Sequence, residues 1–334
     1  MTIFTPHHAE FLRVLADRIR YAFGFGKPLE QVTGLVAAAR LRETDSLVPA
    51  SGYDPAPASS TSSASSAPLK MRSQLSSAGV APDKAAPCTG VLIINADDWG
   101  RDRHNTERIL ECVRRKTVSS VSAMVFMEDS ERAAALAREA GIDVGLHLNF
   151  TAPFSATNCP AQLLEKQRQL SNHLLRHRYA QVIFHPGLAG AFEYVVEAQL
   201  DEFRRLYGAA PERFDGHHHM HLCANVLYGK LLPAGTIVRR NFSFRPGEKS
   251  VINRLYRSFG DRMLARRHRC VDFFFALDSL ETSGRLQRIF SLAHQYVVEL
   301  ETHPIDPREY EFLMGNEIFR QAAGLQISPR YTVS

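Results

Sequence analysis

Apolar and polar positions follow an alternating plan from about residue 90 onward. Residues 91–97 (VLIINAD) form an apolar run typical of a buried strand, and residues 105–115 then follow helical spacing. A long polar insertion follows the third strand, and helical stretches separate most of the others. Six further strands are expected, at residues 119–125, 143–149, 213–217, 236–240, 271–276 and 296–302.

Strands that alternate with helices are typical of βαβ units and a parallel sheet. About seven such strands predict an α/β fold, a distorted (β/α) barrel, over residues 89–334. No GxGxxG or GxxxxGK[ST] motif follows the first strand, which argues against an open nucleotide-binding sheet.

The first part of the chain follows a different pattern. Within residues 1–42, Phe11, Leu15 and Ile19 recur at helical spacing, which predicts a helical segment that docks on the main domain or a partner. Arginines flank its apolar face, so a helix lying at a membrane surface is the alternative. Residues 43–88 are rich in Ser, Ala and Pro and have little to bury, which predicts a flexible linker.

The composition excludes several classes of protein. Of the 334 residues 45% are hydrophobic, yet no run reaches the roughly 18 apolar residues of a membrane span. The first residues lack a basic start followed by an apolar stretch, so we expect no signal peptide. The five cysteines are scattered without a CxxC pair, which favours a reducing, cytoplasmic location and argues against a thiolate metal site.

The net charge of +5 does not decide the function. The densest basic run, residues 262–269 (RMLARRHR), predicts a solvated helix face, with anionic-lipid or nucleic-acid binding as the alternative. Because aromatic residues are not interleaved with these arginines, we expect no nucleic-acid partner.

Candidate chemistry gathers where the predicted strands end. Asp97 and Asp98 end the first strand, His147 lies near the end of the third, His217 ends the fourth, and His303 follows the seventh. Active sites of parallel α/β barrels form at the carboxyl ends of the strands, because the loops there converge on one mouth. The five side chains are therefore expected to meet.

Two imidazoles and one carboxylate form a ligand set that leaves positions open for water and substrate. We assign Asp98 as the ligand and Asp97 as the general base, with His303 as the general acid. In the run Asp215-Gly-His-His-His-Met-His221, alternation allows one or two of the four histidines to face the mouth. The spacing alone does not show which of them do so, and the others would support the ligand or orient substrate.

Five segments in this order resemble one known family: LIINADDWG, SSVSAMV, GLHLN, FDGHHHMH and ETHP. They are similar to the YdjC-like carbohydrate deacetylases, also called the ChbG/HpnK family, over roughly residues 91–315. The resemblance implies a (β/α) barrel that removes an acetyl group from an N-acetylated amino sugar with a divalent cation, Mg²⁺ or Zn²⁺. It is also compatible with a homodimer.

The resemblance implies a role for individual residues as well. The metal ligands would be Asp98, His147 and His217, with Asp97 as the base and His303 as the acid. Substrate contacts would come from Asn149, His219, His221 and Arg239, or from Arg240 in place of its neighbour. The N-terminal extension departs from the family pattern, and the stretch between His147 and His217 has no clear match in disaccharide-acting members.

Three other functions compete with this interpretation. Two histidines and a carboxylate also describe non-haem iron oxygenases, although their close His-x-Asp pair is missing. A sugar-binding protein with a retained metal site is a non-enzymatic alternative. A glycoside hydrolase needs paired carboxylates about 5–9 Å apart, and the sequence shows only the adjacent Asp97 and Asp98.

Overall fold

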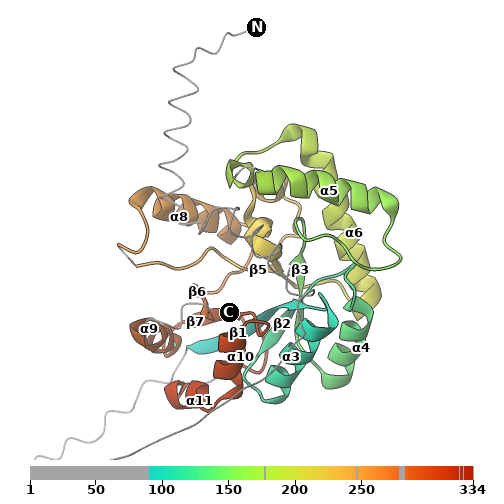
Figure 1. Ribbon diagram of the computed structural model, residues 1–334. Helices are drawn as coiled ribbons and strands as arrows, with labels where there is room; N and C mark the ends of the chain where they lie inside the picture. Colours follow the sequence, from blue (N-terminus) through green and yellow to red (C-terminus); the bar gives the residue numbers. More distant parts are fainter. Residues whose placement is uncertain are drawn as a thin grey trace, which may run out of the picture. The chain divides into compact units, whose positions relative to one another are not determined.

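A parallel sheet wrapped by helices organises the computed structural model (Figure 1). The structure describes residues 90–176, 178–245, 247–277, 283–322, 324–325 and 327–333. The predicted helical segment at 1–42 and the predicted linker at 43–88 lie outside these ranges.

The sheet has seven strands in the order β5-β4-β3-β2-β1-β7-β6, and each neighbouring pair is parallel. This confirms the predicted α/β class and its seven strands. The strands are β1 (Val91–Trp99), β2 (Ser120–Ala123), β3 (Val144–Leu148), β4 (Arg213–Gly216), β5 (Ile237–Val238), β6 (Phe273–Ala276) and β7 (Val297–Thr302).

Closure of the barrel is incomplete. The edge strands β5 and β6 are not paired with each other in the described sheet, and Ile237 of β5 instead bridges Arg269, four residues before β6. The fifth strand, expected over 236–240, keeps only two residues in the sheet. The fold is therefore an incompletely closed barrel, which confirms the distorted (β/α) barrel that the strand pattern predicted.

Helices cover the outer face of the sheet (Figure 1). Within β1, Leu92, Ile94 and Ala96 pack in this outer core, whereas Ile93 belongs to a small cluster inside the barrel. The alternation of a strand thus separates two cores. The helices are α3 (Arg103–Arg114), α4 (Ser130–Ala140), α5 (Ala161–Arg176), α6 (Ala189–Tyr207), α7 (Ala224–Gly229), α8 (Val251–Ala265), α9 (Ser283–Ala293), α10 (Pro307–Met314) and α11 (Glu317–Gln321).

A capping side chain and a glycine in the left-handed region fix the ends of two helices. The Asp102 side chain caps α3 by accepting the backbone N–H of Asn105, and Gly141 ends α4 in the left-handed region. The stretch interpreted as a polar insertion contains α5, which buries Leu163, Leu170 and Leu174. Short 3₁₀ turns complete the connections at Arg178–Gln181, Pro186–Leu188 and His217–Leu222.

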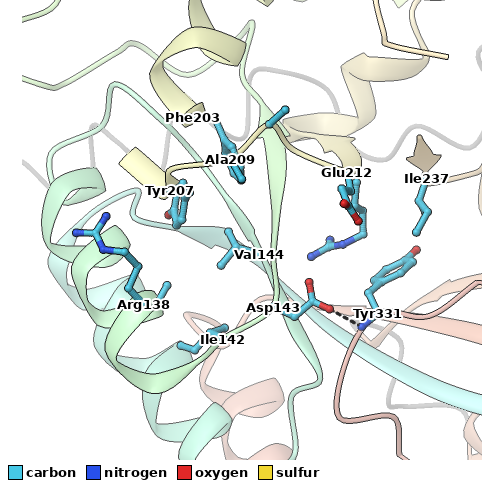
Figure 2. A pocket seen from close by; sticks show the side chains of 13 residues that line it. Arg138, Ile142, Asp143, Val144, Phe203, Tyr207, Ala209, Glu212, Ile237 and Tyr331 are labelled. Carbon is cyan, nitrogen blue, oxygen red and sulfur yellow. Dashed lines mark hydrogen bonds between the residues drawn. The ribbon is translucent and has the colours of Figure 1, made fainter. Parts of the chain in front are cut away.

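The C-terminal segment closes the amino end of the barrel. Ile327 bridges Leu92, and the backbone N–H of Tyr331 donates to Asp143 Oδ2 at 2.8 Å, drawn as the dashed line in Figure 2. A cavity of about 330 Å³ opens here, lined in part by Tyr331 and Ile237. It lies at the opposite end of the strands from the side chains expected to carry chemistry.

The described residues bear on the cysteines and on membrane-spanning helices. Within the described residues, Cys112, Cys159, Cys223 and Cys270 are free thiols. Among the helices that the structure describes, none combines the length and the apolar character needed to cross a bilayer.

Candidate active site

The end of β1 turns so that two adjacent carboxylates face the same mouth. In a regular strand Asp97 and Asp98 would point to opposite sides. Here Asp98 has a φ of +66°, and the pairing of β1 with β2 shifts register between Ala96 and Trp99. A left-handed aspartate costs conformational energy, and such strain is common at functional sites. The turn allows the two carboxylates to act separately.

Asp98, His147 and His217 lie together, buried, at the carboxyl ends of β1, β3 and β4. Asp98 Oδ1 is 3.1 Å from His217 Nδ1 and 3.5 Å from His147 Nε2, and the ligand atoms of the three residues lie within 4.8 Å of one another. Asp98 Oδ1 and His147 Nε2 are buried without a hydrogen-bond partner. Orphaned polar atoms are costly, and a cation among them would satisfy both. The donor set therefore fits a divalent metal.

Asp215 on β4 orients the first of these histidines. Its Oδ1 lies 2.8 Å from His147 Nδ1, while its Oδ2 accepts the Ser122 hydroxyl at 2.5 Å. A proton on Nδ1 leaves Nε2 as the lone-pair donor facing Asp98. Burial alone would lower the pKa of His147, but the charges of Asp97 and Asp215 outweigh it and raise the pKa to about 9. Metal binding would thus displace a proton.

The histidine run folds into a tight loop that sends its members in different directions. Gly216 suits this tight turn, because a Cβ there would lie 3.0 Å from the backbone nitrogen of His221 and push that backbone aside. His218 and His219 both adopt left-handed φ angles. Burial lowers the pKa of His217, which keeps the predicted ligand neutral. His218 Nδ1 lies 3.1 Å from the Thr151 hydroxyl.

Asp97 is held by an arginine inside the barrel. Arg239 donates to its two carboxylate oxygens at 2.6 and 2.7 Å, and Asn95 adds a third bond at 2.8 Å. Burial opposes ionisation, but Arg239 and His147 outweigh it and lower the pKa of Asp97 to about 2. The side chain is thus an oriented, unprotonated carboxylate beside the ligand set.

His303 lies on the other side of Asp97, paired with a second buried acid. Its Nε2 is 3.5 Å from Glu301 Oε1, and Glu301 Oε2 is 3.6 Å from His219 Nε2. Burial and the charge of Asp97 raise the pKa of Glu301 to about 8. For His303, burial lowers the pKa, but Glu301 and Asp97 reverse this and raise it. The pair retains a proton at neutral pH.

Comparison with known proteins assigns most of the described chain to one family. A family described as YdjC-like protein matches residues 91–322. The chain belongs to the YdjC-like family.

Curated relatives carry names that refer to sugars. A chitooligosaccharide deacetylase of Enterobacter sp. (strain 638) is 29% identical over 53% of this chain and 64% of its own length. A carbohydrate deacetylase of Mus musculus is 32% identical over 48% of this chain and 52% of its own length. The chain therefore spans only about half to two thirds of these relatives.

A solved structure from Enterococcus faecalis V583, named for cellobiose-phosphate cleavage, superposes with a TM-score of 0.51. The match covers 72% of this YdjC-like chain and 97% of the other, at 18% sequence identity. At that identity the likeness shows a shared fold alone.

The residues expected to contact substrate are mostly enclosed. The Asn149 side-chain oxygen accepts hydrogen bonds from the backbone of residues 151 and 152. His221 Nε2 lies 3.0 Å from the Arg239 carbonyl, and the Arg239 guanidinium donates hydrogen bonds to Asp97. All three are buried, so as placed they support the site rather than reach a sugar. His219 is partly exposed and faces the mouth beside Glu301. Arg240 points elsewhere, to Asp261 at 2.8 Å.

Several residues of the site were missed in the sequence. Asp215 and Glu301 each lie two positions before a predicted histidine, so both point to the same side of their strands as that histidine. Glu299 follows the same alternation and accepts Arg239 Nε at 2.7 Å. The spacing of two was the available signal, but its use required knowing which strand face is interior.

Proposed function

We propose that the chain is a metal-dependent carbohydrate N-deacetylase. The observation that carries the proposal is the cluster of Asp98, His147 and His217, in which buried Asp98 Oδ1 and His147 Nε2 lack hydrogen-bond partners. The cluster lies beside the carboxylate of Asp97 and the pair of Glu301 and His303. The names of the curated relatives support a sugar substrate.

Asp98, His147 and His217 would hold the cation, either Mg²⁺ or Zn²⁺. When bound, such an ion polarises an amide carbonyl and acidifies water. Oxygen and nitrogen ligands without a thiolate suit either ion.

The protein's own groups would move the protons. Asp97 accepts a proton from the attacking water as the bond from water oxygen to the acetyl carbon forms. His303 Nε2 then donates its proton to the amine nitrogen as the carbon–nitrogen bond breaks, which releases acetate and the free amino sugar. Arg239 fixes the orientation of Asp97 throughout, because its two bonds leave that carboxylate little freedom.

Acetate release tests the proposal directly. The purified chain is offered oligosaccharides of N-acetylglucosamine, and acetate is measured with and without a chelator. We expect release that stops on chelation and returns with added metal. Release that survives complete metal removal contradicts the metal role, whereas binding of the sugars without release favours the sugar-binding alternative.

A single substitution separates the roles of the two adjacent aspartates. Asp97→Asn should keep metal and lose about 10²–10⁴-fold in kcat, because it removes only the base. The exposed Asp201→Asn serves as the matched control and should leave both quantities unchanged. Loss of bound metal in Asp97→Asn would exchange the assignments of Asp97 and Asp98.

A further inference from the structure

Helix α8 presents its apolar side chains to solvent. Val251, Ile252, Leu255 and Phe259 are 66%, 62%, 65% and 52% exposed. They recur at helical spacing, while the helix buries only Asn253 and Leu264. An amphipathic helix on a globular protein normally turns this stripe inward. Figure 1 shows α8 on the outside of the barrel.

Neighbouring segments extend this apolar surface. Tyr228 at the end of α7 is 53% exposed, and it lines a shallow pocket together with Val182, Tyr256 and Phe259. Ile183 and Phe184, next along the chain from Val182, are exposed as well. We call this surface the α8 patch: Ile183, Phe184, Tyr228, Val251, Ile252, Leu255, Tyr256 and Phe259. Contiguous exposed apolar surface marks an interaction site more often than scattered apolar residues do.

The segment that carries α8 is strongly basic. Residues 245–269 contain eight Arg or Lys and two acidic residues, a net +6, whereas the whole chain carries +5. The two acids pair with arginines outside this segment, Asp261 with Arg240 and Glu248 with Arg288. Among the described residues, the ion pairs of these two acids therefore do not involve the Arg and Lys residues of the segment itself.

This combination selects one kind of partner. A second copy of the chain would bring two strongly basic surfaces together, which like charges oppose. Nucleic acid would satisfy the arginines but leave the aliphatic side chains without a partner. An anionic lipid surface satisfies both, because apolar side chains enter the acyl boundary while arginines meet the headgroup phosphates.

We propose that the α8 patch docks the protein on an anionic membrane surface, with α8 lying in the plane of the interface. The proposal rests on exposure and charge, and it does not depend on the deacetylase activity. It also assigns a partner to the basic run at 262–269, for which the sequence left anionic-lipid binding as an alternative.

Vesicle flotation with the full chain tests the proposal. One set of vesicles is phosphatidylcholine, and the other mixes three parts of it with one part phosphatidylglycerol. We expect binding to the mixed vesicles that weakens as salt is raised, since headgroup charge is screened. The triple variant Ile252→Ser/Leu255→Ser/Phe259→Ser should weaken binding at least about tenfold.

Matched variants exclude general effects of surface polarity and of folding. Leu164→Ser/Leu175→Ser/Phe319→Ser changes three exposed apolar residues outside the patch and should bind like the parent. Arg254→Gln/Arg262→Gln keeps the apolar stripe and should lose both affinity and salt dependence, so it reports on the patch even where the triple variant fails to fold.

Three results would overturn the proposal. One is equal vesicle binding by the parent and both patch variants, as would occur if residues 1–42 alone held the lipid. Another is the absence of binding to either vesicle. The third is a patch variant that turns a dimer into a monomer in sedimentation while vesicle binding stays unchanged, which assigns the surface to a second copy of the chain.

Discussion

Asp97 and Glu301 are neighbouring buried acids whose environments push their pKa values apart. Both lose solvation, yet Arg239 donates two hydrogen bonds to Asp97, whereas Glu301 Oε2 has no hydrogen-bond partner. The pKa of Asp97 falls to about 2 and that of Glu301 rises to about 8. Such divergence is how one site holds a base and an acid at the same pH. The proton-donating side of the proposed reaction is therefore Glu301 with His303.

Replacing Glu301 should change the pH profile more than the structure. The negative charge of Glu301 favours protonated His303, so Glu301→Gln should lower the pKa of His303. Activity that needs this proton is lost as pH rises through that pKa, so the alkaline limb of kcat should move to lower pH. The measurement is kcat against pH, with the exposed Glu165→Gln as the control. An unchanged alkaline limb would show that Glu301 does not set the proton on His303.

The site residues could be predicted only where the sequence showed the end of a strand. Apolar runs located the ends of four strands, and these delivered Asp97, Asp98, His147, His217 and His303 to one mouth, as observed. The supporting residues could not be predicted in the same way. Asp215 and Arg239 act through partners far away in the chain, such as His147 and Asp97, and such pairs depend on strand order and register.

Among the elements, the C-terminal segment is one that hydrophobic periodicity did not predict. In the described residues it forms neither a helix nor a strand, and the buried aromatic side chain of Tyr331 anchors it inside the barrel. The Tyr331 hydroxyl donates to Glu299 Oε2 at 2.5 Å, and Glu299 Oε1 accepts from Arg239 at 2.7 Å. The segment thus reaches Asp97 through two buried residues, Glu299 and Arg239. A lone aromatic residue near a chain end carries no periodic signal.

Removing the Tyr331 hydroxyl should cost stability. Tyr331→Phe keeps the ring but leaves a buried oxygen of Glu299 without its partner, which should lower the free energy of unfolding by about 1–3 kcal/mol. Denaturant melts followed by circular dichroism measure this difference. Tyr296→Phe, at a partly exposed ring, is the matched control and should change it by less than about 0.5 kcal/mol. Equal stability of the two variants would mean that the hydroxyl contributes nothing to the barrel.

At the scale of the whole molecule, the barrel interior is short of positive charge. Asp97, Asp98, Asp215, Glu299 and Glu301 are buried there. The positive charges against them are the two buried arginines, Arg213 and Arg239, and the proton on His147 that a metal would displace. Unpaired buried charge is strongly unfavourable. A divalent cation at the Asp98 cluster and the proton shared by Glu301 and His303 would balance the five carboxylates. Under the proposed function, the stability of the interior should therefore depend on a bound cation.

Metal should raise the melting temperature through this charge balance. A ligand that binds only the folded state at about 100 times its Kd adds about 2.7 kcal/mol. For a domain of this size that corresponds to roughly 5–10 °C in Tm. Calorimetry of the chelated chain with added Zn²⁺ or Mg²⁺ measures the shift without any substrate. His217→Ala should abolish the shift because it removes a ligand, whereas His303→Ala should keep it. A shift that survives in His217→Ala would place the cation elsewhere, and the second cluster of Asp97, Glu301 and His303 would then be its site.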